Sequence, residues 1–143
     1  EKSGSMYLTD VRKARNEYIN VILNPEQESI EKFLYFNAAK FLDESETLRC
    51  IKLLEMQKFS MQMFTSCGWF FSDISGIETI QILQYAARAI EIAKEVTGTD
   101  LEPEFLERLS SAESNLKKYK DGKELYLNEV IKSKFVNLKE IEL

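Results

Sequence analysis

Very few residues in this chain interrupt a helix, and this constrains its fold more than any other feature. The 143 residues include only two prolines and five glycines, the residue types least favourable inside a helix. Between these breaks, apolar side chains recur at intervals of three and four residues, which is typical of amphipathic helices. We therefore predict an all-α protein, folded as a single helical bundle of about five or six helices.

Capping signals place the first three expected helices. The first covers residues 7–23, and Asn24 and Pro25 then favour an N-cap and a first helical residue. The pair Asp43 and Glu46 matches a capping box, so a third helix should begin there. The residues expected to face the core from these helices are Leu8, Val11, Tyr18, Ile22, Ile30, Phe33, Leu34, Ala38, Phe41, Leu48, Ile51, Leu54, Phe59 and Met63.

Three more helices follow. A second capping box at residues 75–78 opens a helix that should end at Gly98, and Pro103 and Asp121 favour the starts of two others. The tail, residues 136–143, alternates apolar and polar residues and is either a short strand or an irregular end. The expected core residues here are Ile77, Ile80, Leu83, Ala87, Ile90, Ala93, Phe105, Leu106, Leu109, Ala112, Leu116, Leu125, Tyr126, Val130 and Ile131.

Charge and residue content exclude several classes of function. The net charge is −5, which argues against a nucleic-acid-binding surface. No apolar run approaches the roughly 20 residues that cross a bilayer. The chain has no histidine, so a histidine-dependent catalytic triad is impossible, and we expect no metal and no cofactor. Two cysteines are too few for a disulfide framework and favour a reducing, cytoplasmic setting.

The start of the chain suggests a piece of a longer protein. Residues 1–5, Glu-Lys-Ser-Gly-Ser, precede Met6 and resemble an expression scar or a disordered end. We interpret residues 6–143 as a helical accessory domain of a larger protein.

One segment departs from the helical pattern. Residues 64–71 contain four aromatic side chains and a glycine, including Trp69, the only tryptophan. Two interpretations remain open. The aromatic residues could fill the core of the bundle, with Gly68 relieving crowding. Alternatively, Trp69 could offer its ring to a sugar while Asp73 accepts hydrogen bonds from its hydroxyl groups.

Residues 53–75, Leu-Leu-Glu-Met-Gln…Met-Phe-Thr-Ser-Cys-Gly-Trp-Phe-Phe-Ser-Asp-Ile-Ser, resemble a signature of a C-terminal helical region called domain of unknown function 3536. That region occurs in glycoside hydrolase family 57-like (alpha-amylase/alpha-mannosidase-like) proteins. The likeness continues through residues 76–79 and 84–88 and reaches Ser114-Asn115 and Asp121-Gly122.

The resemblance implies that an N-terminal catalytic (β/α) barrel is the partner of this chain and that the helices close one side of its oligosaccharide cleft. Both catalytic carboxylates would lie on the barrel, so the chain would not catalyse alone, and the parent would be a glycoside hydrolase or glucanotransferase. The candidate substrate-binding residues are Thr65, Ser66, Cys67, Gly68, Trp69 and Asp73. For Cys67, an activated thiol is the alternative to the buried structural thiol that we expect. A purely structural bundle without a ligand is the alternative for the whole chain.

Overall fold

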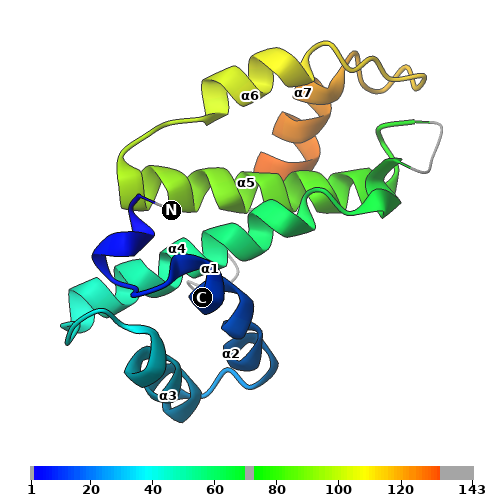
Figure 1. Cartoon of the computed structure of the whole chain (residues 1–143). Helices are drawn as coiled ribbons and strands as arrows, with labels where there is room; N and C mark the ends of the chain where they lie inside the picture. Colours follow the sequence, from blue (N-terminus) through cyan, green and yellow to red (C-terminus); the bar gives the residue numbers. More distant parts are fainter. Residues whose placement is uncertain (1, 70–72, 133–143) are drawn as a thin grey trace, which may run out of the picture. The chain divides into compact units, whose positions relative to one another are not determined.

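The computed structural model describes residues 2–69 and 73–132. For Trp69 it describes the backbone but not the side chain. Regular structure in those residues is helical apart from two isolated bridges, which confirms the prediction of an all-α helical bundle. The chain forms two compact units, Glu1–Gln57 and Lys58–Leu143, with the boundary inside one helix. The α-helices (Figure 1) are α1 (Val11–Glu17), α2 (Ile19–Leu23), α3 (Gln27–Asn37), α4 (Glu44–Gln62), α5 (Ile77–Thr97), α6 (Glu102–Leu109) and α7 (Gly122–Leu125).

The helix expected over residues 7–23 is wrong in its start and its continuity. Asp10 has extended backbone, and its carboxylate accepts the backbone N–H groups two and three residues on, so it is the N-cap of α1. Leu8 precedes this helix and pairs with Ala38 in an isolated antiparallel bridge. Tyr18 separates α1 from α2. The helix is thus interrupted at one residue where the apolar spacing alone predicted a continuous helix.

The second expected helix corresponds to α3, which begins after Glu26 and not after the predicted N-cap residue. The Asn24 side chain donates to Ser29 Oγ at 3.1 Å instead of capping the helix, and Glu26 occupies the N-cap position. The helix ends at Asn37, so Phe41 lies beyond it and is 92% exposed. The expectation that Phe41 faces the core is therefore wrong.

The first unit has its own apolar core. The ring of Tyr18 meets Phe33 edge to face, with 5.6 Å between ring centroids, and the Tyr18 hydroxyl donates to Glu55 at 2.8 Å. Burial, reinforced by this carboxylate, raises the pKa of Tyr18 above its ordinary value. The buried members of the core are Tyr7, Leu8, Ala14, Tyr18, Val21, Phe33, Leu42, Cys50 and Leu54.

The start of α4 confirms the predicted capping box. The backbone N–H of Glu46 donates to the Asp43 carboxylate at 2.8 Å, and the Glu46 carboxylate accepts the Asp43 N–H at 3.3 Å. Leu54 is buried as expected, but Leu48 is more than half exposed, so its assignment to the core is wrong.

In the second unit, α5 ends as predicted but begins differently. Gly98 has φ +75° and closes the helix in the left-handed region. At the other end Gly76 is the N-cap, and the backbone N–H of Ser75 donates to Asp73 rather than to Glu78. The Ser75–Glu78 capping box is therefore wrong. Ile77 is 78% exposed, which also corrects its expected core position.

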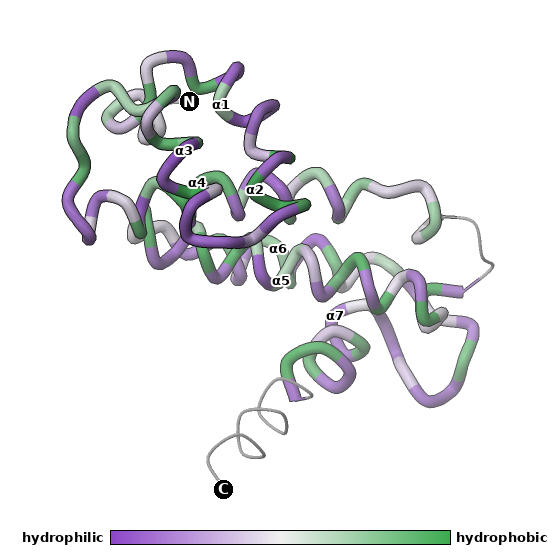
Figure 2. Tube along the Cα trace, turned by 90° about the horizontal axis from the view of Figure 1, so that it is seen from below, coloured by the Kyte–Doolittle hydropathy of each residue, from purple (hydrophilic) through white to green (hydrophobic). Residues whose placement is uncertain are grey.

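The remaining helices pack beside α5. The Asp121 carboxylate accepts the backbone N–H of Glu124 at 2.9 Å and caps α7 as predicted, and a π-helical turn, η3 (Tyr126–Ile131), continues it. Figure 1 shows this segment between α6 and α5, and Figure 2 shows hydrophobic and hydrophilic residues alternating at short intervals along the helices. The buried core comprises Leu83, Ala87, Tyr119, Leu125, Tyr126 and Val130.

The helix expected over residues 103–116 is shorter than predicted. It ends at Leu109, and the half-exposed Leu116 lies in the following loop, so Leu116 is not a core residue. The predicted strand or irregular end at residues 136–143 lies outside the described residues.

Candidate functional site

The candidate segment contains a short 3₁₀ helix, η2 (Ser66–Trp69), that lies against α5. A Cβ atom added to Gly68 would lie 2.9 Å from Cγ1 of Ile82 and closer still to Cδ1. The Thr79 hydroxyl donates to the carbonyl oxygen of Gly68 at 3.2 Å. The absence of a side chain at Gly68 thus lets η2 approach α5 closely, as the crowding interpretation of Gly68 requires.

Asp73 joins the start of α5 to the loop after α6. Its carboxylate accepts the backbone N–H of Asn115 at 2.6 Å, the hydroxyl of Ser114 at 3.2 Å and the backbone N–H of Ser75 at 2.9 Å. Hydrogen bonds from the Ser75 hydroxyl and backbone, then from Asn115 and Ser114, lower the pKa of Asp73 to about 2. The carboxylate is therefore ionised at neutral pH and anchors two loops.

Thr65, Ser66 and Cys67 are exposed on this segment. The expectation of a buried structural thiol at Cys67 is wrong, because a short turn presents it at the surface. Cys50, in the other unit, is the buried cysteine, and burial raises the pKa of its thiol to about 11. Both thiols are free.

The aromatic part of the prediction is only partly described. Trp69 closes η2 with its backbone, and its side chain lies outside the described residues, as do Phe70 and Phe71. The structure therefore brings Gly68 and Asp73 to the same end of α5, through Thr79 and Ser75. The choice between a core and a ligand role for the Trp69 ring stays a prediction.

Large apolar side chains are exposed on both sides of this segment in the sequence. Phe64, just before η2, is 70% exposed, and Ile77, at the first turn of α5, is more exposed still. Met61 on the last turn of α4 is also exposed. Exposed large apolar side chains that cluster into a patch are typical of a surface that contacts another molecule or domain, and these three residues are candidates for such a patch.

Sequence reasoning missed the partners that hold the segment. Ser114 and Asn115 were noted only as a faint part of the resemblance, and nothing local connects them with Asp73, 41 and 42 residues away. Thr79 and Ile82 are three residues apart and share one face of α5, but nothing in the local sequence connects them with Gly68. The sequence signals for the contact of Ser114 and Asn115 with Asp73 are weak: a Ser-Asn pair in a turn, and an aspartate just before a helix start.

The described part of the chain contains neither a cluster of metal-binding side chains nor a membrane-spanning helix. No group of three or more Cys, Asp or Glu side chains there could hold a metal ion. None of the helices in residues 2–69 and 73–132 is long and apolar enough to cross a membrane.

Comparison with known proteins gives a single relationship. No curated protein matches this chain, and no solved structure does. One family model, described as "Domain of unknown function (DUF3536)", matches residues 1–143. Because the match spans the whole sequence, including the η2 segment and Asp73, this chain belongs to the DUF3536 family.

Proposed function

We propose that this chain is a helical accessory domain that packs on a catalytic (β/α) barrel of its parent protein and lines one side of a carbohydrate cleft. The observation that supports this most is the exposed apolar surface beside η2, which includes Phe64 and Ile77. Burying such side chains stabilises an interface by about 25 cal/mol for each Å² removed from water. We take the partner to be the barrel because residues 53–75 resemble a signature found in glycoside hydrolase family 57-like proteins.

The anchoring of the segment suits a cleft wall. Gly68 packs on Ile82, and Asp73 ties the following turn to Ser114 and Asn115, so both ends of residues 68–73 are fixed to the second unit. Fixed positions of Gly68 and Asp73 favour ligand binding beside these two residues, because less conformational entropy is lost on association. We place Trp69 at the cleft as the ring that stacks on a sugar, with Thr65, Ser66 and Cys67 beside it.

The chain itself supplies no catalytic group in this proposal. The barrel carries both carboxylates of a glycoside hydrolase or glucanotransferase. The parent is cytoplasmic, in keeping with two free cysteines.

The test is Trp69→Ala in the full-length parent, assayed for binding and turnover of maltooligosaccharides. We expect a loss of about fivefold or more in affinity, since aromatic contacts in a cleft contribute on the order of 1 kcal/mol or more. Tyr35→Ala is the matched control, because Tyr35 is an exposed aromatic of the other unit. Unchanged glycan binding and turnover in Trp69→Ala would disprove the cleft role.

A second candidate function is a purely structural interaction domain without a ligand. The exposure of Tyr35, Phe36 and Phe41 in the first unit favours it, because a second apolar surface far from η2 in the sequence suits a domain that contacts protein only. Phe64→Ser should then weaken association between the separately expressed barrel and this chain while Trp69→Ala leaves glycan binding intact. If Trp69→Ala instead lowers glycan binding with association unchanged, this second function is excluded.

A further inference from the structure

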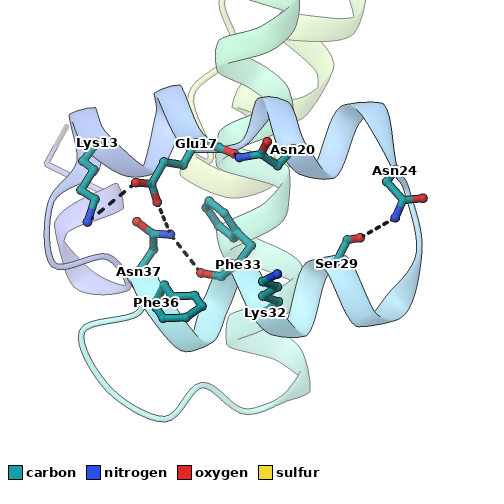
Figure 3. Close-up of a pocket in the computed structure, with 9 residues that line it drawn as sticks. All are labelled: Lys13, Glu17, Asn20, Asn24, Ser29, Lys32, Phe33, Phe36 and Asn37. Atoms are coloured by element: carbon teal, nitrogen blue, oxygen red, sulfur yellow. Dashed lines mark hydrogen bonds and ion pairs between the residues drawn. The ribbon is translucent and has the colours of Figure 1, made fainter.

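A polar pocket of about 580 Å³ lies in the first unit between α1–α2 and α3 (Figure 3). Its volume is within the range of small-molecule sites, about 300–1,000 Å³. None of its lining residues belongs to the η2 segment. The proposed cleft function therefore gives it no role.

Asn37 supplies an unused hydrogen-bond acceptor at this pocket. The side chain is only 4% exposed, and its amide N–H₂ group donates to Glu17 Oε2 and to the carbonyl oxygen of Phe33, both at 3.0 Å. Within residues 2–69 and 73–132, no group donates to Asn37 Oδ1. Among the described residues, the fully buried side-chain polar atom without a partner is Gln62 Oε1, so Asn37 Oδ1 reaches solvent and is open to a hydroxyl group bound in the pocket.

Asn20 adds a second acceptor. Its amide N–H₂ group donates to the carbonyl oxygen of Glu17 at 3.0 Å, which leaves its Oδ1 without a donor in the described part of the chain. Asn20 comes from α2 and Asn37 from the end of α3, so the two side chains line the pocket from different helices (Figure 3). Together they can accept from two hydroxyl groups of one ligand.

The pocket has one unpaired positive charge. Lys13 pairs with the Glu17 carboxylate at 3.7 Å, so these two charges offset each other. Lys32 lines the same pocket, and in the described residues it has no hydrogen-bond or ion-pair partner. Beside it Phe36 presents a largely exposed aromatic ring. An ammonium group, amide oxygens and an apolar ring together match a ligand that combines an anionic group, hydroxyl groups and an apolar face.

We propose that this pocket binds a small hydroxylated anion, in the class of sugar acids and sugar phosphates. Lys32 contacts the anionic group, Asn20 and Asn37 accept from hydroxyl groups, and Phe36 covers the apolar face of the ligand. A carboxylate and a phosphate share this chemistry, and the choice of probes distinguishes them.

The test is isothermal titration calorimetry of the full chain with four probes: glucose 6-phosphate, glucuronate, glucose and inorganic phosphate. Binding of glucose 6-phosphate or glucuronate, with glucose and phosphate each at least about tenfold weaker, supports the proposal and identifies the anionic group. Equal affinity for inorganic phosphate and glucose 6-phosphate would refute the hydroxyl contacts. Absence of heat with both acids at millimolar concentration would refute the site.

Two substitutions localise the binding. Lys32→Gln should weaken binding of the acid probe by about tenfold or more, because it removes a charge-assisted hydrogen bond. Asn20→Ala should weaken binding of the same probe by a smaller factor. Lys2→Gln is the matched control, since it removes the same charge from an exposed site in the same unit outside the pocket. Lys32 is exposed, so circular dichroism should show an unchanged fold. Equal affinity of Lys32→Gln and the control would overturn the proposal.

Discussion

Replacing Gly68 with alanine is expected to destabilise the second unit, because the new Cβ would overlap Ile82. That atom would lie 2.9 Å from Cγ1 and 3.4 Å from Cγ2 of Ile82, and Cδ1 is nearer than either. Ile82 is itself buried, so the side chain cannot turn into solvent. Overpacking of this kind costs about 1–3 kcal/mol, and the lower entropy of unfolded alanine returns about 0.4–1 kcal/mol because φ at Gly68 is not positive. The net loss is centred on about 1.3 kcal/mol and is at most about 2.6 kcal/mol.

Urea denaturation measures this loss. Far-UV circular dichroism follows the helices, and the fluorescence of Trp69, the only tryptophan, follows the neighbourhood of the substitution. A lower midpoint at an unchanged slope reports a loss of stability. Gly98→Ala is the control, because no atom lies within 4 Å of its added Cβ and its cost comes from φ +75° alone.

Changing Ile82 separates the overlap from other causes. Ile82→Val removes Cδ1 but keeps Cγ1, and Ile82→Ala removes every atom that the new Cβ would meet. The cost of Gly68→Ala should fall in that order, while the cost of Gly98→Ala stays constant in all three backgrounds. An equal cost of Gly68→Ala in the wild-type and Ile82→Ala backgrounds would show that close packing on α5 is not the reason for glycine here.

Three further predictions follow from the same contacts. The pKa of Asp73, about 2, lies below its ordinary value of 3.8, so its contribution to stability is present above about pH 4 and is lost as the pH falls through 2. The acid unfolding curve of Asp73→Asn should lack this component. An acid unfolding curve identical to that of the wild type would argue against a stabilising role of the Asp73 carboxylate. Asp121→Ala removes the acceptor for the Glu124 N–H and should lower the free energy of unfolding by about 1 kcal/mol, seen as a lower urea midpoint; an unchanged midpoint would mean that this cap contributes nothing. A disulfide reagent at pH 8 should label Cys67 rapidly and Cys50 only after unfolding, because Cys67 is exposed whereas Cys50 is buried and its pKa is raised to about 11. Mass spectrometry of the labelled chain measures which cysteine reacts. Rapid labelling of Cys50 in the native state would contradict the prediction.

The helical class and several helix ends follow from local signals in the sequence. Proline and glycine are rare enough that strands and long loops have little room. The capping box of Asp43 and Glu46, the left-handed Gly98 and the Asp121 cap are all found as predicted. Each of these signals acts within three or four residues of the chain, so its partners are fixed by sequence spacing.

Tertiary packing determines which apolar residues are buried and what surrounds the candidate segment. A stripe of apolar residues along a helix shows which face is apolar, but Leu48 and Ile77 are exposed because no neighbour in the described residues covers them. The exposure of Cys67, the approach of Gly68 to Ile82, and the hydrogen bonds from Ser114 and Asn115 to the carboxylate of Asp73 likewise depend on how distant parts of the chain fold together. Such contacts join residues up to 42 positions apart, and no local spacing specifies them.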